Sequence, residues 1–167
     1  SRATALPVPA LPEPFVPPPD ESPPTIAGGF PTATNPTMKN VTLTMQLDEP
    51  GEVFYMVVAA GALGNTTPPA GDIISGTGVA APPSVVVTGV MPITQHDTAT
   101  SYIVTGLQHT TAYDIYVAAR DDATPVNNVQ ATVKMATFTT APGTGWDGLQ
   151  AHVEHGVPNT HAWGVVW

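Results

Sequence analysis

Ten of the 20 prolines in this 167-residue chain fall in its first 31 residues, which restricts the backbone of that segment severely. Each proline fixes φ at about −65° and disfavours the helical conformation in the residue before it. The segment therefore favours an extended polyproline II conformation, and we expect a Pro-rich arm over residues 1–27. The arm is either a stiff linker or a segment that docks on protein through apolar side chains such as Phe15 and Val16.

Beyond the arm, apolar and polar residues alternate in short runs that turn residues separate. The clearest run is Val-Thr-Leu-Thr-Met-Gln-Leu at residues 41–47. Further runs cover residues 52–59, 84–90, 101–105, 113–119 and 129–139. A period of two residues is typical of half-buried strands. The best helical candidate is a single turn at residues 69–75, which Asp72 would cap. The pattern predicts a β-sandwich over residues 28–140.

Charge and composition exclude several classes of protein. Four Lys+Arg stand against 13 Asp+Glu, which gives a formal net charge of −9. Nucleic acids and anionic membranes attract clustered cations, so we expect no nucleic-acid partner and no membrane insertion. The chain has no cysteine, which excludes disulfides, thiolate nucleophiles and Cys-ligated metals. It starts at Ser1 rather than Met, so we expect a processed product or an excerpt.

The chain shows no pattern typical of an enzyme, and we expect neither catalytic residues nor a cofactor. Nucleophilic catalysis needs a Ser, Cys or Thr beside an oriented base, and no Gly-x-Ser-x-Gly motif is present. His152, His155 and His161, with Glu154 or Asp147, are conceivable zinc ligands. In an extended, glycine-rich segment, however, His152 and His155 would point to opposite faces. Solvated histidines are the simpler interpretation.

Acidic pairs also occur, and the most interesting one lies in a loop. The pairs are Asp20-Glu21, Asp48-Glu49 and Asp121-Asp122. Asp121-Asp122 opens the segment 121–128, whose oxygen atoms could bind calcium, but the spaced acidic ladder of a calcium loop is missing. Ordinary turn chemistry explains the segment better, and we expect no metal.

A family resemblance centres on residues 101–117. This segment alternates as a strand, passes Leu107, and resumes its alternation at Tyr113, six residues later. It resembles the fibronectin type III and related immunoglobulin-like β-sandwiches, in which a Tyr hydroxyl bonds back to the upstream backbone in a tyrosine corner. The resemblance implies that role for Tyr113, with Leu107 as its packing partner. It covers roughly residues 28–140 and implies an all-β, immunoglobulin-like fold with a Pro-rich arm and an aromatic C-terminal tail.

Other segments resemble the family less closely. Residues 53–58 look like its third strand and residues 134–140 like its last. Met45 stands at the alternation position where the second strand of the family usually has a Trp. The connection of residues 60–99 is long, and it resembles a variant found in extracellular bacterial and algal repeats.

Two acceptor sequons for N-linked sugar are present, Asn40-Val-Thr and Asn65-Thr-Thr, whereas Asn35 is excluded by the proline that follows it. Asn40 immediately precedes a predicted strand and Asn65 lies in a predicted loop, so both should be on the surface. The Pro-rich arm also resembles, in composition alone, the hydroxyproline-rich wall glycoproteins of plants and algae. We therefore expect covalent glycans.

The segment 141–167 follows the predicted sandwich and contains all three tryptophans of the chain. Large apolar groups in an extension mark a contact, either with the chain's own sandwich or with another protein. Trp163, Val165 and Trp167 alternate as one face of a strand, which could add to an open sheet edge of another copy.

Together these features predict a non-enzymatic structural subunit of an extracellular, glycosylated fibril or surface appendage, located outside the cell. Its partner would be itself, in a head-to-tail homopolymer built through the terminal arms. The alternative is an adhesin or carbohydrate-binding module of a cell-wall or surface protein.

Overall fold

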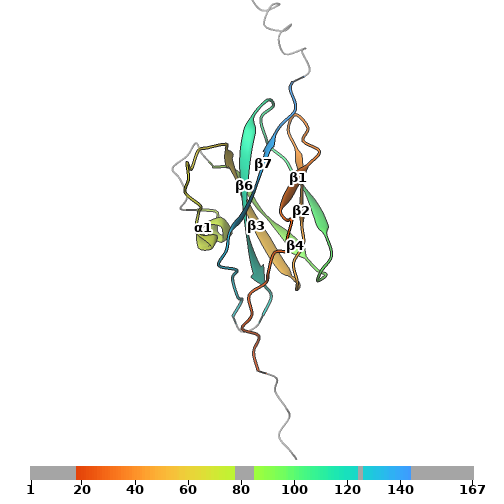
Figure 1. Cartoon of the computed structure of the whole chain (residues 1–167), viewed down its shortest axis with the longest axis vertical. Coiled ribbons are helices and arrows are strands. Elements are labelled where there is room, and N and C mark those ends of the chain that lie inside the picture. Colours follow the sequence, from red (N-terminus) through yellow and green to blue (C-terminus); the bar gives the residue numbers. More distant parts are fainter. Residues whose placement is uncertain (1–17, 78–84, 124–125, 144–167) are drawn as a thin grey trace, which may run out of the picture.

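The computed structural model describes residues 18–77, 85–123 and 126–143, which form an all-β sandwich of two antiparallel sheets (Figure 1). The three-stranded sheet has the order β1 (Thr32–Thr34), β2 (Val41–Met45), β5 (Thr100–Val104). The four-stranded sheet has the order β4 (Val85–Ile93), β3 (Gly51–Ala59), β6 (Ala112–Asp121), β7 (Lys134–Thr139). One short helix, α1 (Ala70–Ser75), lies in the connection between β3 and β4.

The core lies between the two sheets, because the apolar residues that alternate along each strand point to the inner face of its sheet. In β2 the inward residues Val41, Leu43 and Met45 are at most 1% exposed, and the threonines between them are half-buried. From the other sheet, Tyr113 stacks on Phe138 with ring centroids 5.5 Å apart. Met45 is one of the fully buried side chains of this core.

The sandwich begins a little before residue 28, where we had placed its boundary. Ile26 is 3% exposed, belongs to the core, and forms an isolated bridge with Leu47. The Thr25 N–H also donates to Asp48 Oδ1 at 2.7 Å. Thr25 and Ile26 therefore belong with the sandwich rather than with the arm, because Thr25 supplies a backbone N–H, which a proline lacks, and Ile26 supplies a core side chain. At the other boundary, the last strand, β7, ends at Thr139.

The predicted helical turn is present, but Asp72 does not cap it. Pro69 occupies the N-cap position, and no side chain caps the helix. The fixed φ of proline suits the start of a helix, so Pro69 begins α1 without a capping oxygen. Gly76 ends the helix with φ 67°, and its N–H donates to the carbonyl of Ile73. Within the described residues, no helix is long and apolar enough to span a membrane.

Candidate functional site

Tyr113 sits at the corner between β5 and β6 and is 1% exposed. Its hydroxyl accepts a hydrogen bond of 2.8 Å from the backbone N–H of Gln108, and Leu107 beside it is 2% exposed. Thr140 Oγ1 donates to the Gln108 carbonyl at 2.6 Å, so the backbone N–H and the backbone carbonyl of Gln108 are both hydrogen-bonded. This arrangement is structural: it fixes the turn before β6, and it is the contact that the family resemblance implies for Tyr113.

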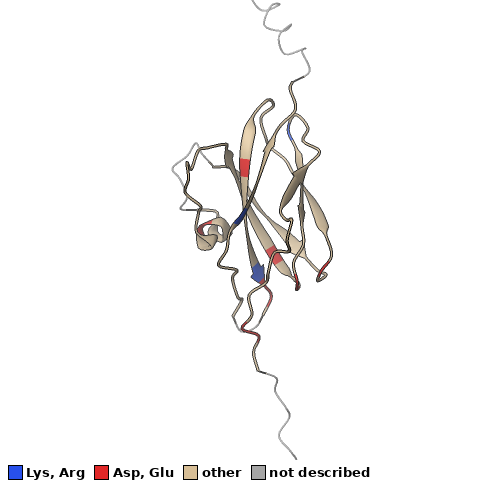
Figure 2. Ribbon diagram, in the orientation of Figure 1, with Lys and Arg blue, Asp and Glu red and all other residues tan. Residues whose placement is uncertain are grey.

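One end of the sandwich gathers acidic side chains (Figure 2). Ligand oxygens of Asp20, Glu49 and Asp121 lie within 4.8 Å of one another. Asp48 and Asp122 are near enough to raise the pKa of Glu49. This concentration of like charge places the negative potential of the chain at the end where β3 begins and β6 ends.

The acidic end offers few free ligands for a cation. Asp121 is 2% exposed, and its carboxylate accepts hydrogen bonds from Ala123 N–H, Asn128 N–H at 2.6 Å and Asn128 Nδ2 at 2.7 Å. Calcium takes about 6–8 oxygen ligands, whereas Asp20 and Glu49 add only two carboxylates to this one. Asp121 therefore acts chiefly as the cap that closes the β6–β7 loop, which agrees with the turn chemistry expected for residues 121–128.

Removing the negative charge of Glu49 should stabilise the folded protein. Burial raises its pKa above 4.5, and the neighbouring carboxylates raise it further. Around these pKa values the folded state therefore binds more protons than the unfolded state. The free energy of unfolding falls as the pH rises from about 4.5 through the folded-state pKa of Glu49, and it stays lower at higher pH. We expect Glu49→Gln to raise the melting temperature at pH 7 but not at a pH below 4.5, as measured by thermal denaturation. Exposed Glu21→Gln is the control, and a lower melting temperature for Glu49→Gln at pH 7 would contradict this charge balance.

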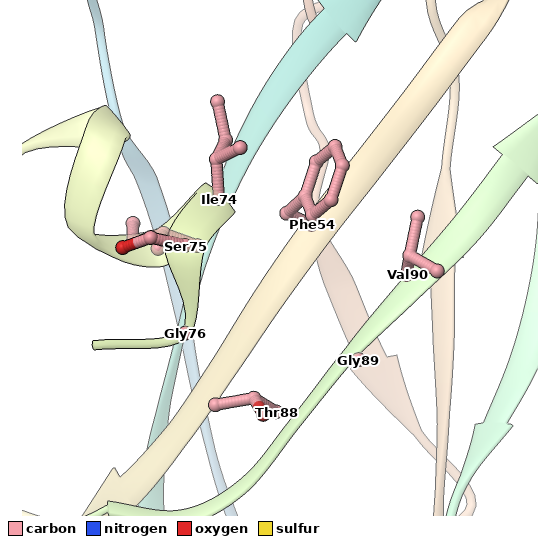
Figure 3. A pocket seen from close by; sticks show the side chains of 8 residues that line it. Phe54, Ile74, Ser75, Gly76, Thr88, Gly89 and Val90 are labelled. Carbon is pink, nitrogen blue, oxygen red and sulfur yellow. The ribbon is translucent and has the colours of Figure 1, made fainter.

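The outer face of the four-stranded sheet carries a second apolar cluster, separate from the core. Its buried members are Met56, Val58, Ile73, Tyr116 and Ala118. Beside α1 this face is hollowed into a groove of about 200 Å³ between α1, β3 and β4. Figure 3 shows Phe54 standing between Ile74 and Val90 along the groove. The volume is below the ~300–1,000 Å³ of typical ligand pockets.

Exposed apolar side chains occur on β4 and β5, each of which is one of the two edge strands of its sheet. Val86 and Val90 of β4 are 37% and 42% exposed, and Tyr102 and Ile103 of β5 are 42% and 59% exposed. Tyr102 lies against Tyr55 with ring centroids 6.0 Å apart. Burial, and then the proximity of Tyr102, raise the pKa of Tyr55 to about 12, so its hydroxyl stays neutral at physiological pH.

The contacts that Arg120 makes could not be predicted from the sequence. Its guanidinium forms an ion pair with Glu52 and lies 4.9 Å from the centroid of the Phe54 ring. β3 and β6 are paired so that Glu52 stands directly opposite Arg120. The alternation of the two strands was visible, but the register that brings these residues together was not.

Several predicted residues lie outside the described part of the chain. These are Phe15, Val16, Trp163, Val165 and Trp167, together with the candidate zinc ligands Asp147, His152, Glu154, His155 and His161. Of the sequons, Asn65 is exposed in the connection that leads to α1. Asn40 is half-buried just before β2, and its N–H donates to Thr37 Oγ1 at 3.0 Å.

No protein-family model and no curated protein matches this chain. Among solved structures, it is similar to the solution structure of the sensor domain of the anti-sigma factor RsgI4 in Pseudobacteroides cellulosolvens. The sequence identity is 10% and the TM-score 0.38, over 71% of this chain and 74% of that one. These values are too low to transfer a fold or a function, so no functional inference follows from the likeness.

Proposed function

We propose that this chain is a non-enzymatic structural subunit of an extracellular, glycosylated polymer that assembles head to tail through its terminal arms. One observation carries the proposal: the described chain enters the sandwich at one end and leaves at the opposite end (Figure 1). At the entry, Asn128 Nδ2 donates to the Asp20 carbonyl at 3.1 Å. At the exit, Gly143 lies beside the ring of His109.

This geometry favours a linear array. A contact between different surfaces of successive copies does not close on itself and so generates a filament. The entry end is acidic (Figure 2). Exposed Lys39 lies near the exit end, two residues after Thr37, whose carbonyl accepts a hydrogen bond from the Ala141 N–H. Opposite local charges at the two ends favour head-to-tail over head-to-head contact between copies that each carry a net charge of −9.

Removing residues 1–17 tests the proposal, because every described residue is retained. We expect a folded protein that no longer forms fibres in electron micrographs and sediments as a small species. Phe15→Ser with Val16→Ser in the full chain is the matched variant, since it keeps the arm and removes two of its apolar side chains. Fibres of normal length from the truncated chain would contradict a role for the arm and leave the C-terminal tail as the candidate junction.

We expect N-linked sugar at Asn65 and Asn40 in the native material, because both are acceptor sequons and neither is buried: Asn65 is exposed and Asn40 is half-buried just before β2. Intact-mass measurement should give more than 17.2 kDa, and Asn65→Gln should remove one glycan increment. Asn35→Gln is the control, since Pro36 blocks that position as an acceptor. A native mass of the bare chain would contradict glycosylation.

We also propose that the sandwich is of the fibronectin type III kind. Supporting this are the strand order, which places β1, β2 and β5 in one sheet and β4, β3, β6 and β7 in the other, and the Tyr113 corner.

Tyr113→Phe should therefore lower the free energy of unfolding by about 1 kcal/mol, because the Gln108 N–H loses its acceptor. Tyr102→Phe, which removes a hydroxyl from a 42% exposed ring beside Tyr55, should cost less in the same urea titration. Equal losses for the two variants would contradict a special role for the corner.

A role as an adhesin or carbohydrate-binding module remains the second candidate, and exposed Tyr102 beside Tyr55 favours it because sugars stack on aromatic rings. Binding to a glycan array that Tyr102→Ala abolishes, by a protein that stays monomeric, would support this function over the polymer.

A further inference from the structure

We propose that two copies of this chain pair antiparallel through the free edge of β4, which joins their four-stranded sheets into one continuous sheet. This contact is side by side and does not use the terminal arms. It therefore adds to the proposed polymer and can be true or false independently of it.

β4 is the longest edge strand of the described structure. It pairs with β3 on one side, and no described strand pairs with its other side. As whole strands the other edges are shorter, since β1 has three residues, β5 five and β7 six. The uninterrupted part of β4, Val87 to Met91, is five residues long, so what distinguishes β4 from β7 is its lack of a charged residue. β7 also begins with Lys134 and packs near β1 across the sandwich. A long unpaired row of N–H and C=O groups is a ready template for another strand.

The side chains of β4 do little to discourage pairing. Proteins usually protect edges with charged residues, prolines or bulges. β4 contains no charged residue. A register shift between Val57 and Val58 leaves Val86 without a partner in β3, and Pro92 lacks an N–H. Between these two interruptions, Val87 to Met91 forms a regular five-residue edge, with Val87 and Val90 among its β-branched residues.

For a pair of copies, the charge distribution favours the antiparallel orientation. Ile93 at the end of β4 lies opposite Gly51, which also pairs with Asp121, so β4 points toward the acidic end. An antiparallel pair places the acidic ends of the two copies at opposite ends of the dimer. A parallel pair would bring them together and oppose association. The antiparallel contact is also self-complementary, as a two-fold dimer requires.

The regular segment sets the register. A two-fold axis through Gly89, the midpoint of Val87 to Met91, places Thr88 opposite Val90 of the partner subunit. Both residues lie on the outer face and line the groove beside Phe54 (Figure 3). On the inner face, a Cβ at Gly89 would be 2.3 Å from Tyr55 Oη, so a residue without a side chain stands at the axis.

Disulfide trapping tests this register directly, because the chain has no cysteine of its own. Full-length Thr88→Cys and Val90→Cys chains, mixed and oxidised, should give covalent dimers, since cross-strand Cα atoms about 4.5–5.5 Å apart suit a disulfide. Each variant alone should give much less, because its cysteines are then two residues out of register. Met135→Cys, exposed on the opposite edge strand of the same sheet, is the control. A yield from the mixture no higher than this control would overturn the proposal.

Sedimentation of the full chain gives an independent measurement. Val90→Lys should weaken the pairing by at least about tenfold in dissociation constant, whereas Met135→Lys should leave it unchanged. Circular dichroism checks that both variants fold. Equal dimerisation of wild type and Val90→Lys would overturn the β4 interface. If removing residues 1–17 abolishes fibres but leaves disulfide trapping unaffected, both the head-to-tail polymer and the β4 pairing stand. If the full chain forms fibres but gives no disulfide trapping, only the β4 pairing is contradicted.

Discussion

Gly51→Ala should lower the free energy of unfolding by about 3 kcal/mol, the upper end of the usual cost of overpacking. A Cβ at Gly51 would lie 2.3 Å from the Arg120 carbonyl oxygen and 3.0 Å from Asp121 Cα. Both atoms belong to the backbone of β6, so no side chain can rotate away to make room. β3 and β6 would have to separate at the acidic end, where Gly51 is paired with both β4 and β6.

The matched control is Gly71→Ala in α1. A Cβ there meets nothing within 4 Å, and alanine is favoured over glycine in a helix by roughly 0.5–1 kcal/mol. We therefore expect opposite signs for the two substitutions in urea titrations. Far-UV circular dichroism is the suitable signal, because the three tryptophans of the chain all follow residue 143. A neutral Gly51→Ala would mean that β3 and β6 are less closely held at this end than described.

Much of the fold was predictable from local sequence. The prediction of an all-β sandwich is confirmed, because alternation such as that of residues 41–47 directly reports which side chains enter the core. β1 was missed, since three residues are too few to show a period. Asp72 was wrongly taken as a cap, because sequence spacing does not reveal which residue precedes the first helical turn. Ile26 was assigned to the arm, because a single apolar residue after a proline run gives no periodic signal.

The candidate surfaces depended on tertiary pairing and were harder to predict. The apolar run at residues 85–87 was visible in the sequence, but whether β4 lies at an edge or at the centre of a sheet depends on strand order. Likewise, the acidic end forms because β3 starts and β6 stops at the same place. Asp121-Asp122 could be assigned to a turn, yet the alternation alone did not indicate that Asp121 is buried and Asp122 exposed.

That difference between the two aspartates leads to the second large effect. Asp121→Ala should lower the free energy of unfolding by roughly 3 kcal/mol, because several buried or half-buried donors lose a charged acceptor. These donors are Ala123 N–H, Asn128 N–H and Asn128 Nδ2. Relief of repulsion with Asp20 and Glu49 offsets a part of this loss.

Asp122→Ala is the control beside it, and we expect less than about 0.5 kcal/mol for this exposed position. The loss for Asp121→Asn should lie between those for Asp121→Ala and Asp122→Ala. The amide oxygen still accepts from the Asn128 N–H, but the second carboxylate oxygen, an acceptor, is replaced by an NH₂ donor. This order distinguishes a hydrogen-bonded cap from a source of repulsion, since repulsion alone would make both Asp121 variants more stable than wild type. If chelators reproduced the loss seen in Asp121→Ala, the carboxylate would be acting through a bound cation, and the loop would owe its closure to that ion rather than to Asn128.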